Sequence, residues 1–168
     1  LETLNRAAVF HPTGTGKSCI AWKVVEAHPQ TTFFWLVAGA QRLALRQAEL
    51  TRYNGGTLPG NVRFCDCEKL AAATPEQWVR LGEQKPGCIV LDCYHELSAV
   101  CWAQSVQKLL RMCPQAKVLG LGVPNGAPVC AAAQELFADC IVSHMTVAEA
   151  MAAGTMPVPS AYAALLWP

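Results

Sequence analysis

Near its start the chain reads Ala7-Ala8-Val9-Phe10-His11-Pro12-Thr13-Gly14-Thr15-Gly16-Lys17-Ser18, and this stretch decides the fold. Residues 7–10 are apolar, as in a short buried strand, and residues 17–27 have the pattern of a helix that ends before Pro29. Gly14 and Gly16 in the intervening loop allow backbone N–H groups to turn inward around an anion. The first turn of the helix directs its positive end at the same anion. The order strand, loop, helix therefore predicts a site for phosphate groups.

The side chains of this loop are of the types that nucleotide phosphates and their metal ion require. Lys17 carries the charge that neutralises the outer phosphates, and the Ser18 hydroxyl is placed to coordinate Mg²⁺. We therefore expect ATP and Mg²⁺ as cofactors. His11 departs from the strict pattern, which has glycine there; the alternative is a glycine-rich turn that precedes Lys-Ser by chance. The predicted nucleotide-binding residues of the loop are Pro12, Thr13, Gly14, Thr15, Gly16, Lys17 and Ser18.

Beyond this stretch, apolar runs alternate with helical patterns along the whole chain. Strands are expected at residues 31–37, 62–65, 88–92, 117–121 and 140–143, and helices at 41–53, 75–81, 100–112, 129–137 and 146–153, with Thr74 as an N-cap. Continuous apolar strands that alternate with helices indicate an α/β fold with a mostly parallel sheet and helices on both faces. We interpret residues 1–160 as one domain and residues 161–168 as an exit segment.

The composition is that of a globular chain in a reducing compartment. Of the 168 residues 52% are hydrophobic, and 13 Lys and Arg against 12 Asp and Glu give a net charge of +1, so any binding of nucleic acid must come from a local patch. Residues 150–168 are uncharged but interrupted by glycine and proline, which argues against a membrane span. The nine cysteines form no C-x-x-C pair, so we expect thiols in the core rather than a zinc site. Free thiols are typical of a reducing compartment, so we expect a cytoplasmic location.

A phosphate loop of this kind needs an acidic residue at the end of a neighbouring buried strand to hold Mg²⁺. Residues 88–92 form such a strand and end at Asp92. The loop, the pattern Leu91-Asp92-x-x-His95 and the separation between them resemble superfamily 2 helicases of the DEAD/DEAH-box type. The strand at residues 117–121 is similar to the one that carries the third motif of that family. The resemblance covers nearly the whole chain and matches the first of the two RecA-like domains of such proteins.

This resemblance implies a three-layer RecA-like fold of the P-loop NTPase type. It implies that Ser18 and Asp92 coordinate Mg²⁺, and that His95 links the nucleotide site to the partner domain. The implied partners are ATP, DNA or RNA, and a second RecA-like domain outside this chain, which would supply an arginine to the transferring phosphoryl group.

The chain departs from the family at several motifs. The residue after the metal aspartate is a water-polarising glutamate in the family and Cys93 here, and a thiol is a weaker base and a poor acceptor. Residues 122–124, Gly-Val-Pro, stand where the family has Ser-Ala-Thr, residues 38–39 lack the usual Pro with Ser or Thr, and residues 66–67 put a carboxylate where a Thr-Tyr pair is usual. ATP binding is therefore expected, whereas these departures argue against ATP hydrolysis, against its coupling to movement and against tight binding of nucleic acid.

Two arginines are the candidates for a nucleic-acid contact. Arg42 and Arg46 share one face of the helix at residues 41–53, a region that contacts the phosphate backbone in the resembled family, although an ordinary solvated face would look the same. Three functions stay open: a helicase-type motor domain, a non-catalytic nucleotide-binding scaffold, and a small-molecule P-loop kinase. The last does not explain Asp92-x-x-His95. The i, i+2 spacing of Cys93 and His95, and the glycine loop predicted beside them, argue against a pair of nucleophile and base.

Overall fold

Six parallel strands form the central sheet of the computed structural model, which describes residues 5–94, 98–124 and 131–157. The strands lie in the order β3-β2-β4-β5-β1-β6, and every neighbouring pair is parallel. This confirms the α/β fold with a parallel sheet. The strands are β1 (Arg6–Phe10), β2 (Phe33–Val37), β3 (Val62–Asp66), β4 (Cys88–Asp92), β5 (Lys117–Gly122) and β6 (Ile141–His144).

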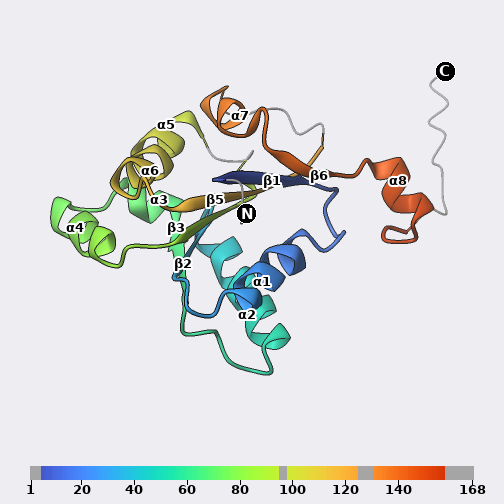
Figure 1. Ribbon diagram of the computed structural model, residues 1–168, viewed down its shortest axis with the longest axis horizontal. Helices are drawn as coiled ribbons and strands as arrows, with labels where there is room; N and C mark the ends of the chain where they lie inside the picture. Colours follow the sequence, from blue (N-terminus) through green and yellow to red (C-terminus); the bar gives the residue numbers. More distant parts are fainter. Residues whose placement is uncertain (1–4, 95–97, 125–130, 158–168) are drawn as a thin grey trace, which may run out of the picture.

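Helices cover both faces of this sheet, which makes three layers (Figure 1). One face is covered by α1 (Lys17–Ala27) and α2 (Ala40–Tyr53). The opposite face is covered by α3 (Cys67–Ala71), α4 (Pro75–Glu83), α5 (Ala99–Cys101), a π-helix (Trp102–Val106), α6 (Gln107–Met112) and α7 (Ala131–Phe137). The last helix, α8 (Val147–Ala152), lies beyond the edge strand β6.

The strand β2 is apolar throughout because its alternate residues enter two different cores. In β2, Phe33, Trp35 and Val37 pack in the core beneath α1 and α2, whereas Phe34 and Leu36 pack in the core beneath the other helices. All five side chains are at most 2% exposed. The tryptophans of the described residues all lie in these cores.

Two local features differ from the expected elements. The structure has an additional short helix, α3, which starts directly after β3 because the Asp66 carboxylate accepts a hydrogen bond from the Glu68 N–H and caps it. The single helix expected at residues 100–112 contains a π-helical turn, inside which the Ser105 hydroxyl donates to the Cys101 carbonyl. Both features coincide with hydrogen bonds from side chains to the backbone, which hydrophobic periodicity does not reveal.

Within the described ranges, no helix combines the length and the apolar character that crossing a lipid bilayer requires.

Candidate functional site

The loop between β1 and α1 has the backbone geometry of an anion-binding turn. Gly14 has φ 88° and Gly16 has φ 85°, which are left-handed conformations that glycine adopts without strain. No described atom lies within 4 Å of a Cβ built at either position, so the backbone angle and not crowding is the reason for glycine. Gly16 also caps α1 without a side chain, which leaves the first turn of that helix open toward the loop.

Lys17 is folded back over this loop. Its Nζ donates to the carbonyls of His11 and Pro12, at 2.9 Å each, and the Thr15 hydroxyl donates to the Pro12 carbonyl at 2.7 Å. Burial lowers the pKa of Lys17, while the nearby Cys93 and Asp92 act in the opposite direction. The ammonium group therefore stands at the mouth of the loop, where neutral carbonyls hold it.

The strand order brings Asp92 to the same edge of the sheet as this loop. β5 lies between β1 and β4, with Phe10 beside Gly122 and Asp92 beside Leu121, so the carboxyl ends of the three strands lie at one edge. The Asp92 side chain is 2% exposed, and its Oδ2 accepts a hydrogen bond from Trp35 Nε1 of β2 at 3.1 Å.

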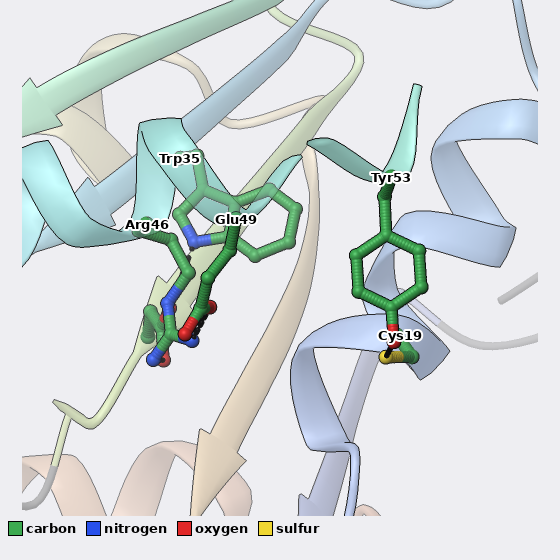
Figure 2. Close-up of polar contacts among 6 residues, drawn as sticks. Cys19, Trp35, Arg46, Glu49 and Tyr53 are labelled. Atoms are coloured by element: carbon green, nitrogen blue, oxygen red, sulfur yellow. Dashed lines mark hydrogen bonds and ion pairs between the residues drawn. The ribbon is translucent and has the colours of Figure 1, made fainter. Parts of the chain in front are cut away.

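Arg46 of α2 forms an ion pair with this buried carboxylate (Figure 2). Its Nε lies 2.6 Å from Asp92 Oδ2, and its Nη2 donates to Asp92 Oδ1 at 3.5 Å. On its other side, Nη1 contacts Glu49 Oε2 at 2.5 Å. Burial disfavours the charge of Arg46, but the carboxylates of Asp92 and Glu49 outweigh burial and raise its pKa. The guanidinium is thus held between one buried and one exposed carboxylate.

A cavity of about 390 Å³ joins the loop to α2. Near its rim the Cys19 thiol of α1 donates to the Tyr53 hydroxyl of α2 at 2.8 Å, which connects the two helices (Figure 2). The cavity is large enough for part or all of a nucleotide. It is lined by Thr13, Gly14, Gly16, Lys17, Ser18, Cys19, Arg46, Glu49, Leu50, Arg52, Tyr53 and Cys93.

Cys93 stands on the wall of this cavity directly after β4, with φ 53°. This left-handed conformation is uncommon for a residue with a side chain, and such conformations occur preferentially at functional sites. Burial raises the pKa of Cys93, and the neighbouring Asp92 raises it further. Cys93 is therefore a neutral thiol at pH 7, which cannot accept a proton from water as a carboxylate would.

The residues at Asp92 do not fit a magnesium ion as they stand. Mg²⁺ needs carboxylate oxygens that are free to coordinate it, in near-octahedral geometry. Both oxygens of Asp92 face donors instead, Trp35 and Arg46, and Ser18 is the other expected ligand that lines the cavity. Among residues 5–94, 98–124 and 131–157, no group of three or more His, Cys, Asp or Glu side chains could hold a metal ion.

The structure brings most of the predicted site residues together but separates Arg42 from Arg46. Lys17, Ser18, Asp92 and Cys93 lie at one edge of the sheet, whereas His95 falls outside the described residues. Arg46 lines the cavity beside the loop, while Arg42, on the preceding turn of α2, is exposed and does not line it.

Sequence reasoning missed the partners of Asp92. Trp35 and Arg46 are 57 and 46 residues away along the chain, so no local pattern joins them to the aspartate. The only available signal is the Arg46–Glu49 pair at i, i+3, which suggests an ion pair along the helix but not one across the site.

No protein-family model matches this chain, and no curated protein matches it either. What the domain binds must therefore be inferred from its own residues.

Proposed function

We propose that this domain binds ATP at residues 12–18 and is the first RecA-like domain of a superfamily 2 helicase of the DEAD/DEAH-box type. The observation that carries the proposal is the glycine loop between β1 and α1, which opens with Lys17 onto a cavity of about 390 Å³ beside the end of β4. The resemblance of the loop and of the segment at Asp92 to that family supports the class of motor. DNA or RNA and a second RecA-like domain are the proposed partners.

The charges of the cavity support a polyphosphate ligand. Lys17, Arg46 and Arg52 line it together with one carboxylate, that of Glu49, so cationic side chains predominate. Glycine-loop amides and a helix N-terminus add partial positive charge at the same place. Every cysteine of the described residues is a free thiol, which suits the cytoplasmic location that we propose.

A second candidate function is a nucleotide-binding scaffold without hydrolysis. It is favoured by the neutral Cys93 at the position of the expected glutamate, and by Arg46 on the aspartate that would hold the metal. The two candidates share the same nucleotide site and differ only in turnover.

Binding is tested with Lys17→Ala and a matched control on the same helix. Lys23 of α1 is 75% exposed and pairs with Glu26, so Lys23→Ala removes an equal charge outside the cavity. Calorimetric titration with ATP is expected to show at least about tenfold weaker binding for Lys17→Ala and no change for Lys23→Ala. Equal and tight ATP binding by all three proteins would reject the proposed site.

Turnover separates the two candidates. ATP hydrolysis is measured with and without DNA or RNA, for the native chain and for Cys93→Glu, alone and joined to a second RecA-like domain. Strong stimulation of the native chain by nucleic acid would exclude the scaffold. If Cys93→Glu gains no activity even with the second domain, then the missing glutamate is not the limiting defect.

A further inference from the structure

We propose that Arg46 takes the place of the divalent cation at this site, so that the domain binds the nucleoside triphosphate as a metal-free anion. This inference rests on the proposed function and adds the ionic form of the ligand. It starts from the mismatch between Mg²⁺ and the surroundings of Asp92.

The first step is that the carboxylate is already satisfied from two sides. Asp92 is 2% exposed, receives the Trp35 indole N–H at 3.1 Å, and has Arg46 Nε at 2.6 Å. A carboxylate buried in this way needs a compensating charge, and the guanidinium supplies it. A metal ion could reach Asp92 only after Arg46 moved away and left its own charge without this partner.

The second step is that Arg46 is tethered and cannot leave easily. Glu49 holds its outer nitrogen, Nη1, at 2.5 Å, and the side chain of Arg46 is 23% exposed. The guanidinium is therefore fixed on the wall of the cavity, with part of its surface open to a ligand. A planar guanidinium binds phosphate oxygens well, so the same group can hold Asp92 and contact the nucleotide.

The third step is the charge of the cavity in the absence of any metal. Three cationic side chains, Lys17, Arg46 and Arg52, line the cavity, against the carboxylate of Glu49 on its wall and that of Asp92 buried behind Arg46, so positive charges outnumber negative ones by three to two. In metal-dependent phosphate loops the ion neutralises much of the phosphate charge. Here the side chains provide positive charge themselves. Metal-free ATP should therefore bind at least as well as its magnesium complex.

The test is a calorimetric titration of the native domain with ATP, performed once in excess EDTA and once in excess Mg²⁺. The dissociation constant in EDTA is expected to be at most about threefold larger than that in Mg²⁺, a difference of about 0.65 kcal/mol. Binding that tightens by about tenfold or more in Mg²⁺ overturns the inference but leaves the proposed function standing. No ATP binding in either buffer overturns the proposed function, and this inference with it.

Arg46→Gln gives a second measurement, with Arg80→Gln on the exposed face of α4 as its control. Without Arg46, Asp92 is free to hold a metal. ATP binding in EDTA is then expected to weaken by about tenfold, and Mg²⁺ should restore part of the affinity. Arg80→Gln should bind as the native domain does in both buffers. If Arg46→Gln shows the same affinity as the native domain in EDTA, Arg46 is only a structural ion pair and the inference fails.

Asp92→Asn covers the case in which Arg46→Gln does not fold, which circular dichroism would reveal. This variant removes the expected metal ligand but leaves Arg46 in the cavity wall. The ratio of its ATP affinities in Mg²⁺ and in EDTA is expected to stay within about threefold of the native ratio, because no ion is lost. A loss of about tenfold or more, seen only in Mg²⁺, would show that Asp92 does hold the ion and would overturn the inference.

Discussion

At the scale of single residues, His11 shows how the glycine loop between β1 and α1 accommodates a side chain where the strict sequence pattern has glycine. The His11 side chain is buried, and its Nε2 lies 2.8 Å from the Ser143 hydroxyl of β6. The pair connects the start of the loop to the edge strand. Burial lowers the pKa of His11, and the positive charges of Lys17 and His144 lower it further. The folded protein therefore favours the neutral imidazole.

This shift predicts a pH dependence of stability. Because the pKa of His11 in the folded state lies below its ordinary value of 6.5, the unfolded chain binds the proton more readily as the pH falls through that value. The contribution of His11 to the free energy of unfolding should be fully present above about pH 6.5 and decrease below it. Urea unfolding at about pH 7.5 and 5.5 is expected to show a smaller pH difference for His11→Asn than for the native chain. Ser143→Ala is the comparison that keeps the imidazole, and an identical pH difference in native protein and His11→Asn would contradict the prediction.

At the scale of elements, α4 begins with the cap that the sequence predicted at Thr74. The Thr74 hydroxyl accepts from the Gln77 N–H at 3.4 Å, and the Gln77 side chain accepts from the Thr74 N–H at 2.8 Å. Pro75 occupies the first turn, where its missing N–H costs nothing. This reciprocal pair satisfies two donors at an exposed helix end.

Removing this cap gives the first prediction at this scale. Thr74→Ala should lower the free energy of unfolding by about 1 kcal/mol, because one donor of the first turn loses its partner. Thr74→Ser keeps the hydroxyl and should cost only a few tenths of that amount, about 0.3 kcal/mol. Chemical denaturation measures both differences. Equal stability of Thr74→Ala and Thr74→Ser would show that the hydroxyl contributes nothing.

The contact between β5 and α7 gives a second prediction at the scale of elements. A Cβ at Gly120 would lie 2.6 Å from Phe137 Cζ, and the Phe137 ring is 1% exposed and packed 4.9 Å from the Tyr94 ring. The ring has little freedom to move, so Gly120→Ala should destabilise the domain by about 1–3 kcal/mol. Gly60→Ala is the control, because no described atom lies within 4 Å of its Cβ. If thermal unfolding shows the two variants to be equally stable, the packing of α7 on β5 is looser than described.

At the scale of the whole molecule, the candidate site depends on elements from distant parts of the chain. The loop follows β1, Asp92 ends β4, Trp35 lies in β2, and Arg46 lies in α2. These elements meet because the parallel sheet places the carboxyl ends of its strands at one edge. A ligand in the cavity contacts α1 and α2 together, which cover the same face of the sheet (Figure 1).

A bound nucleotide should therefore stabilise the entire domain. At an ATP concentration of about 100 times Kd, the free energy of unfolding should rise by about 2.7 kcal/mol, and the melting temperature should rise with it. Scanning calorimetry with ATP is expected to show this rise in the native domain and in Lys23→Ala, and little or none in Lys17→Ala. A native melting temperature that stays constant at a saturating ATP concentration would mean that ATP binds the unfolded chain equally well or does not bind.

Much of the fold follows from local patterns. The predicted bounds of α1 and β4 agree with the structure, and other predicted elements differ by a residue or two, because periodicity and caps are properties of neighbouring residues. The exceptions are α3 and the π-helical turn, where the side chains of Asp66 and Ser105 form hydrogen bonds with the backbone. Such bonds leave no periodic signal.

The sequence by itself determined the glycine loop before α1, the parallel α/β architecture and the cysteine at position 93, because each depends on residues that are adjacent along the chain. Only the tertiary structure decided what surrounds Asp92. The strand order brings α2 and β2 against the end of β4, and Arg46, which the sequence predicts as a nucleic-acid contact, forms an ion pair with that carboxylate. The physical reason is that a buried charge needs an opposite charge within a few ångströms. Packing across the sheet decides which side chain lies that close, and separation along the chain does not.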